Sequence, residues 1–151
     1  MFDGVTFALE GDAAAKKAAA KIARDLGGTS FELRKADKPL YHALGAFSSP
    51  LLIAHLAAAE KIGKKLGLKP ERTRRVIGPI LQKTLQNYLE HGAAAALSGP
   101  LVRGDVETIR KNLHALEGVP MAKEIFLALG KMAARELPVK RKAEIIRLLS
   151  E

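Results

Sequence analysis

Apolar residues in the first third of the chain follow a strand pattern, then a helix pattern, then a second strand pattern. Residues 4–10 alternate between apolar and polar positions, and residues 29–33 form another short strand-like segment. Between them, residues 13–26 carry apolar residues at helical spacing, and Asp12 precedes them as a capping residue. The predicted apolar faces comprise Val5, Phe7 and Leu9 in the first strand and Ala15, Ala18, Ala19, Ile22 and Leu26 in the helix.

From Lys38 onward the pattern becomes helical. Pro39 suits the first turn of a helix, where a missing N–H leaves no hydrogen bond unmade. Pro50 predicts a kink or a break between Ser49 and Leu51, because proline cannot donate the helical hydrogen bond. The apolar stripe then continues through Leu52, Leu56, Ala59, Gly63 and Leu66.

A second long helix follows a turn at residues 67–70. It is predicted to run from about Pro70 to Glu90, with a bend at Pro79. Its apolar positions span two adjacent stripes, and that width predicts a helix buried on more than one side. These positions are Val76, Ile77, Ile80, Leu81, Leu85, Tyr88 and Leu89.

Three further helices are predicted over residues 106–116, from near Pro120, and after Pro138. Their inward faces are expected to hold Val106, Ile109, Leu113 and Leu116, then Met121, Ile125, Ala128 and Met132, then Val139, Ala143, Ile146 and Leu149. The predicted fold class is mainly α: one domain over residues 1–151, with a β-α-β prefix at 1–36 and a helical bundle at 37–151. Two strands alone are marginally stable in water, so the prefix is expected to extend a larger sheet or to pack on the helices.

Composition excludes several classes of protein. A hydrophobic fraction of 48% is enough for a core, and the absence of cysteine excludes disulfides, thiolate metal sites and cysteine nucleophiles. No apolar run approaches the roughly 18 residues that a membrane span needs, and residues 1–4 show no signal-like pattern. We therefore expect a cytoplasmic protein that does not enter a membrane.

The formal net charge of +9 raises the question of an anionic partner. Aromatic residues are not interleaved with the basic ones, as the stacking of single-stranded nucleic acid requires. Solvated helix faces are therefore favoured, and nucleic acid is not the expected partner. The basic residues gather in two stretches: Lys61, Lys64, Lys65, Lys69, Arg72, Arg74 and Arg75, then Lys131, Arg135, Lys140, Arg141, Lys142 and Arg147.

Lys38 and His42 are the first candidates for chemistry. They are four residues apart and therefore share a helix face. Such a pair can donate and accept a proton at a carbonyl or alcohol, and the lysine can steady a developing oxyanion. The spacing alone favours the alternative, in which the lysine is solvated and the histidine lies in the core with its hydrogen bonds formed there. A metal site is not expected, because His42, His55, His91 and His114 have no partner at ligand spacing.

The turn-rich loop before residue 106 is the second candidate region. Gly99 and Gly104 mark two turns, and Asp105 reads as the N-cap of the next helix. Arg103 lies between these turns, and its guanidinium suits either a bound carboxylate or phosphate or an ion pair with Asp105 or Glu107. Neither glycine-marked turn has the pattern of a phosphate-binding loop. Asn87 is predicted to point into packed surroundings, where a buried amide needs hydrogen-bond partners. It is expected either to form a structural hydrogen bond or to contact the substrate.

Taken in order, four segments resemble one family: residues 7–12 (Phe-Ala-Leu-Glu-Gly-Asp), Lys38-x-x-Tyr41-His42, Asn87, and Leu97-Ser98-Gly99-Pro100-x-x-Arg103-Gly104-Asp105-x-x-Thr108. They resemble the C-terminal domain of unknown function in bacterial Rossmann-like oxidoreductases. Those proteins are similar to pyrroline-5-carboxylate reductase, deazaflavin-dependent NADP reductase and the 6-phosphogluconate and hydroxyisobutyrate dehydrogenases. The resemblance extends from about Phe2 to Ala134.

This resemblance implies a helical domain of the 6-phosphogluconate dehydrogenase C-terminal type, which forms a homodimer and closes a substrate cleft over a nicotinamide cofactor. Lys38 would take the lysine position of proton transfer in the hydroxyacid dehydrogenases, and His42 stands where those relatives carry asparagine. We expect Lys38 and His42 to be catalytic and a small-molecule substrate to contact Tyr41, Asn87, Ser98 and Arg103. The loop scaffold is expected to comprise Gly99, Pro100, Gly104, Asp105 and Thr108.

The resemblance also implies a dinucleotide-binding Rossmann domain that would precede these residues and is absent from them. The chain has no glycine fingerprint for a dinucleotide, so no cofactor is expected on it alone, whereas NAD(P) is implied for the full-length protein. The expected function is therefore substrate binding and dimerisation in an NAD(P)-dependent oxidoreductase, without activity in isolation. The alternatives are a free-standing basic helical interaction module that binds nucleic acid, and a structural dimer whose site has decayed.

Overall fold

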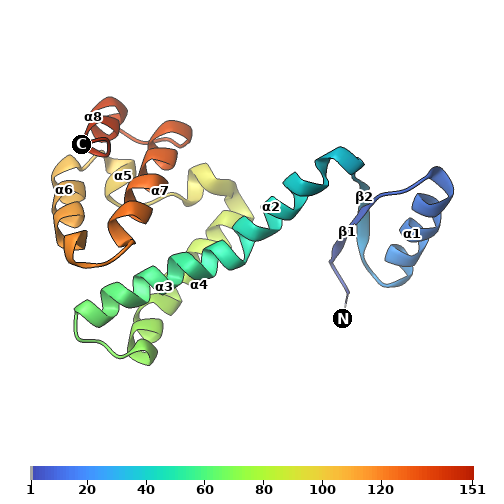
Figure 1. The fold of residues 1–151 in the computed structure, drawn as a ribbon, viewed down its shortest axis with the longest axis horizontal. Coiled ribbons are helices and arrows are strands. Elements are labelled where there is room, and N and C mark those ends of the chain that lie inside the picture. The colour runs from blue at the N-terminus through green and yellow to red at the C-terminus, as the bar shows by residue number, and fades with distance from the viewer. Residues whose placement is uncertain (1) are drawn as a thin grey trace. The chain divides into compact units, whose positions relative to one another are not determined.

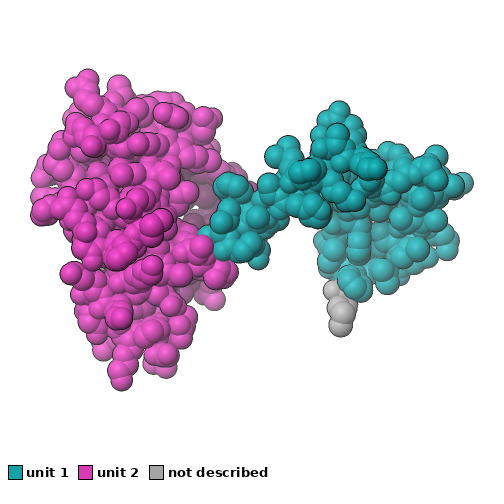
Figure 2. Space-filling view, in the orientation of Figure 1, with its two compact units in different colours: residues 1–52 teal, residues 53–151 magenta. Residues whose placement is uncertain are grey.

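The computed structural model describes residues 2–151 and is 73% helical, with one small parallel sheet near the N-terminus (Figure 1). This confirms the predicted fold class. The chain divides into two compact units, residues 1–52 (unit 1) and residues 53–151 (unit 2) (Figure 2). Unit 1 contains β1 (Thr6–Leu9), α1 (Ala13–Asp25), β2 (Thr29–Glu32), the 3-10 turn η1 (Lys35–Asp37) and α2 (Lys38–Ser48). The later elements are α3 (Pro50–Lys65), α4 (Pro70–Ala96), α5 (Pro100–Arg103), α6 (Val106–Ala115), η2 (Leu116–Gly118), α7 (Ala122–Glu136) and α8 (Lys142–Leu148).

Unit 1 is built on the predicted strand–helix–strand segment. β1 and β2 pair in parallel, with Thr6 opposite Thr29 and their hydroxyl oxygens 2.8 Å apart. Asp12 caps α1, because its Oδ1 accepts a hydrogen bond from the backbone N–H of Ala15 at 2.8 Å. The apolar face of α1, however, was predicted wrongly. Ala23 is the buried residue, with half-buried Ala19 and Ala20 beside it, whereas Ala15, Ala18, Ile22 and Leu26 are exposed. A two-stranded sheet covers only a narrow stripe of the helix.

Proline and glycine divide the long helical region. The helix that starts at Lys38 ends before Ser49, whose φ of −133° and ψ of −83° are not helical, and α3 begins at Pro50. The predicted break is therefore confirmed. α4 begins at Pro70 as predicted and runs to Ala96, but Gly92, with φ 77° and ψ 174°, divides it into two helical segments. The first segment ends close to Glu90, where the sequence predicted the end of the helix. Counted across the break at Ser49, Lys35–Lys65 is the one stretch in residues 2–151 that by length and composition could cross a membrane, with a mean hydropathy of 1.3. By this measure the expectation that no apolar stretch is long enough for a membrane span is wrong.

α4 does not bury its two apolar stripes within this chain. It meets α3 at a close contact, where an added Cβ on Gly63 would lie 3.0 Å or less from three side-chain atoms of Thr73. Thr73 is its only buried residue, whereas Leu89 is 80% exposed. The prediction of burial on more than one side is therefore wrong for a single copy. The residues of the two apolar stripes that are exposed are Val76, Ile80, Leu85, Tyr88 and Leu89.

Unit 2 has its main core where α6, α7 and α8 meet. Its buried side chains are Ile109, Leu113, Ala134, Ile145, Leu148 and Leu149. The inward face of α6 is confirmed. For α7 the prediction is wrong, because Met121, Ala128 and Met132 are exposed. Met121 has a positive φ of 65° and belongs to the turn before the helix. The buried face of α7 instead carries Ala122, Gly130, Ala133 and Ala134. In α8, Ala143 is exposed and Ile145 is buried.

Candidate functional site

The first candidate site lies at the carboxyl edge of the parallel sheet. β1 ends at Leu9 and β2 ends at Glu32, and because the strands are parallel both ends lie at the same edge. Glu10 follows the first strand and Leu33 follows the second. The turn η1 then leads into α2, whose first residue is Lys38. Ligands of parallel α/β sheets bind outside this edge, so its side chains are the first to consider.

A shallow cavity of about 530 Å³ is found at this edge. Its lining residues are Ala8, Glu10, Leu33, Lys38, Tyr41 and His42. Three of the sequence-predicted residues, Lys38, Tyr41 and His42, therefore lie together. The cavity combines four side chains that can bind or release a proton with an apolar wall formed by Ala8 and Leu33.

Glu10 and Lys38 form the closest polar contact of the cavity. The Lys38 Nζ lies 2.5 Å from the Glu10 Oε2, and the side chains are 52% and 27% exposed, respectively. The contact with Lys38 holds the pKa of the Glu10 carboxyl below its ordinary value, and the positive charge of Lys35 acts in the same direction. Lys38 is therefore paired with a carboxylate, although about half of its side chain remains exposed to water.

Tyr41 and His42 complete the cavity. The ring of Tyr41 packs edge-on against Phe31 of β2, with centroids 5.9 Å apart, and its centroid lies 6.0 Å from that of His42. His42 is exposed. The alternative of a histidine satisfied in the core is therefore wrong, whereas a catalytic role for His42 stays a prediction.

The glycine loop has the local geometry that its residues predict. Gly99 and Gly104 both have positive φ, 85° and 69°, a region that favours glycine. Pro100 opens the four-residue helix α5, which Arg103 closes. An added Cβ on Gly104 would lie 2.8 Å from the backbone oxygen of Lys140, so glycine is required there for space as well as for conformation.

Asp105 is a helix cap. Its Oδ1 accepts from the Thr108 backbone N–H at 3.0 Å, and its Oδ2 accepts from the Thr108 hydroxyl at 2.7 Å. These hydrogen bonds lower the pKa of the Asp105 carboxyl, and the nearby charge of Arg103 adds to the effect. Both acceptor oxygens are engaged in starting α6, which supports a scaffold role for Asp105 and Thr108.

The remaining predicted substrate contacts belong to unit 2. Asn87 is half-buried on α4, Ser98 is exposed after α4, and Arg103 is exposed at the end of α5. Within residues 2–151, Arg103 forms no ion pair with Asp105 or Glu107 within 4.0 Å. The guanidinium of Arg103 is therefore available to a ligand, and its role stays a prediction.

A family comparison matches most of the chain. The model described as "Domain of unknown function (DUF2520)" covers residues 5–133. The chain belongs to this family. No curated protein and no solved structure matches the chain. The matched part of the DUF2520 domain contains the sheet edge and the glycine loop but ends before α8, although α8 supplies much of the core of unit 2.

Two features of this DUF2520 domain were not assigned a role from the sequence. Glu10 is one of them. Its position in the sequence could have indicated a role, because it directly follows the first strand, and the second strand, which pairs with it in parallel, leads to Lys38. The other is the segment before α8: the Lys140 backbone N–H donates to the Val102 oxygen at 3.2 Å, and the Arg141 Nη1 donates to the Gly104 oxygen at 3.4 Å. The C-terminal segment therefore holds the glycine loop of the domain in place.

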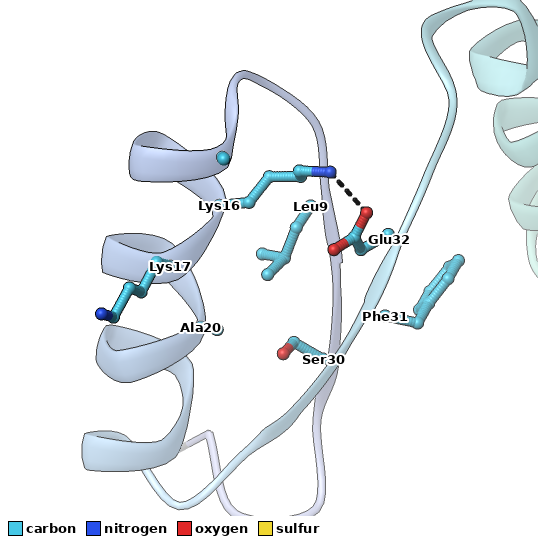
Figure 3. A pocket seen from close by; sticks show the side chains of 8 residues that line it. Leu9, Lys16, Lys17, Ala20, Ser30, Phe31 and Glu32 are labelled. Carbon is cyan, nitrogen blue, oxygen red and sulfur yellow. Dashed lines mark hydrogen bonds and ion pairs between the residues drawn. The ribbon is translucent and has the colours of Figure 1, made fainter.

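A second cavity of about 400 Å³ lies between α1 and the sheet, and Figure 3 shows its lining. Lys16 extends from α1 to form an ion pair with Glu32 of β2, beside the apolar side chain of Leu9. Within the described residues no group of three or more His, Cys, Asp or Glu side chains could hold a metal ion. The sheet edge around Lys38 is therefore the best-supported candidate site of the domain.

Proposed function

We propose that this chain is the substrate-binding and dimerisation domain of an NAD(P)-dependent oxidoreductase. The observation that carries the proposal is the position of Lys38 and His42, one helical turn apart on a cavity at the carboxyl edge of a parallel β-α-β sheet. The Lys38 ammonium can donate a proton or hydrogen bond to a carbonyl oxygen, and the His42 imidazole can accept one from an alcohol. This chemistry suits the interconversion of a carbonyl compound and an alcohol.

The residues of this chain do not fit the cofactor. In a dinucleotide site the turn after the first strand is rich in glycine and presents free N–H groups to the pyrophosphate. Here the turn is Glu10-Gly11-Asp12, with one glycine and two carboxylates, and Asp12 already caps α1. We therefore place NAD(P) on another part of the protein. The outer edges of the two-stranded sheet offer backbone groups with which a larger sheet could pair.

Binding of NADPH tests the proposal. The full-length protein that contains these residues is expected to bind NADPH, whereas the isolated 151-residue chain is expected not to, because its strand–helix turn repels phosphate. The measurement is a titration followed by the fluorescence of the reduced nicotinamide, with circular dichroism to show that both proteins are folded. A folded full-length protein that does not bind NADPH or NADH would overturn the proposal.

Exposed apolar side chains on α4 and on the part of α3 that lies in unit 2 support the dimerisation part of the proposal. Soluble monomers rarely expose large apolar patches, and such patches mark interaction surfaces. Within unit 2, these two helices carry Ile53, Val76, Ile80, Leu85, Tyr88 and Leu89, all exposed. A second copy of the chain would explain why α4 has the apolar pattern of a helix buried on more than one side.

The chain is accordingly expected to sediment as a dimer at micromolar concentration. The double variant Ile80→Asp/Leu89→Asp should shift it to a monomer, because each carboxylate would lose its hydration in an apolar interface. Ala14→Asp is the matched control, since it places a carboxylate on an exposed apolar position of α1, outside this surface. Analytical ultracentrifugation of the three proteins measures their oligomeric states, and a monomeric wild-type chain would count against the interface.

A further inference from the structure

The carboxyl edge of the sheet is nearly neutral, although the chain as a whole is basic. Residues 1–52 contain seven Lys or Arg and six Asp or Glu, a net charge of +1, so unit 2 carries +8 of the +9. Three of the four cations at the edge are paired: Lys38 with Glu10, Lys16 with Glu32, and Arg34 with Asp37. The charge of the fourth, Lys35, is balanced in number by the carboxylate of Asp12, which caps α1. In the part of the chain that the structure describes, this edge therefore offers an anion little net attraction.

The partners of the Glu10–Lys38 pair differ in how they are held. Glu10 directly follows β1, and its side chain is only 27% exposed. Lys38 reaches the pair through a flexible four-carbon stem, which would otherwise sample many conformations. The contact with the carboxylate therefore restricts the positions of the Lys38 Nζ in the cavity that Tyr41 and His42 also line.

We propose, building on the function proposed above, that Glu10 is a positioning residue for Lys38 and that it excludes anionic groups from the cavity. The substrate would then present an uncharged carbonyl or hydroxyl group to Lys38. An ammonium has three N–H donors, so Lys38 can donate to such an oxygen while it remains paired with Glu10. A carboxylate or phosphate would have to displace Glu10 or lie beside its like charge, which is unfavourable.

Anion binding tests the exclusion directly. Inorganic phosphate is titrated into the 151-residue chain at constant pH and ionic strength while the imidazole NMR signals of His42 are followed. Wild-type signals are expected not to respond, whereas Glu10→Gln should give a saturable shift because Lys38 is released. The double variant Glu10→Gln/Lys38→Met should lose this shift. Glu32→Gln, which releases Lys16 at the same sheet edge, is the matched control and should behave as wild type.

The titration of the Glu10 carboxyl tests the positioning. Because Lys38 lowers its pKa from the ordinary 4.5, Lys38→Met should raise it again. The ion pair stabilises the fold above the ordinary value and is lost as the pH falls through the lower, folded-state pKa. The measurement is the pH dependence of the Glu10 side-chain carbonyl ¹³C shift in both proteins.

Two outcomes would overturn this inference: an equal response of wild type and Glu10→Gln to phosphate, or an ordinary Glu10 pKa in the wild-type chain. Neither readout involves a cofactor or turnover. Failure of NADPH binding by the full-length protein would therefore reject the proposed oxidoreductase function separately, while a failed Glu10 experiment would leave that function standing.

Discussion

Replacing Ile145 by Ala is expected to lower the free energy of unfolding of unit 2 by about 2–5 kcal/mol. Ile145 on α8 is 0% exposed and lies in the core cluster with Ile109 of α6 and Ala134 of α7. The substitution would remove buried methyl and methylene groups and leave a cavity that three packed helices cannot easily close. Urea unfolding followed by circular dichroism at 222 nm measures the effect.

Ile146→Ala is the control for this prediction. Ile146 is the next residue of α8 and is only partly buried, so the same change of side chain should cost clearly less. Equal losses for the two variants would contradict the assignment of the α8 core face. The pair also tests whether residues beyond the matched region 5–133 belong to the folded unit.

Replacing Gly63 by Ala is expected to destabilise the α3–α4 hairpin by about 1–3 kcal/mol, the usual cost of overpacking. An added Cβ would lie 2.2 Å from the Thr73 Oγ1 and 2.6 Å from its Cγ2. Thr73 is buried, and its hydroxyl is bonded to the Lys69 oxygen, so it cannot simply rotate away. The two helices would have to move apart at this contact.

Gly45→Ala on α2 should have the opposite sign. Nothing lies within 4 Å of a Cβ built there, so the higher helix propensity of alanine should stabilise the chain by up to about 1 kcal/mol. Thermal and urea unfolding of both variants provides the comparison. If Gly63→Ala were as stable as Gly45→Ala, the close approach of α3 and α4 would not exist in solution.

Elements that depend on neighbouring residues could be predicted from the sequence. Asp12 and Asp105 cap α1 and α6 as expected, because a cap is a hydrogen bond to a residue three positions away. The break at Ser49 follows from the covalent structure of Pro50. The positive φ angles of Gly99 and Gly104 follow from the turn pattern around them.

The buried faces of several helices could not be predicted in the same way. Ile22, Met121 and Met132 lie on apolar patterns and are nevertheless exposed. Periodicity shows that a helix has an apolar side, but the phase of burial depends on which neighbour packs against it. On α7, small residues such as Gly130 and Ala134 face the core because α8 approaches closely there.

The candidate site shows the same division. The four-residue spacing of Lys38 and His42 was enough to place both on one helix face. Their common cavity and the contact between Lys38 and Glu10 depend on the parallel pairing of β1 and β2, which brings residues 28 positions apart in the chain to one edge. Spacing along the chain carries no information about such a contact.

By itself, the sequence determined the helical class, the strand–helix–strand prefix, the caps and the breaks, since these arise from interactions within a few residues. Only the tertiary structure decided that Glu10 neutralises Lys38, that α8 completes the core and that one side of α4 stays uncovered. Those outcomes depend on which surfaces meet in space. Packing and charge pairing act over distances of a few ångströms, whatever the separation along the chain.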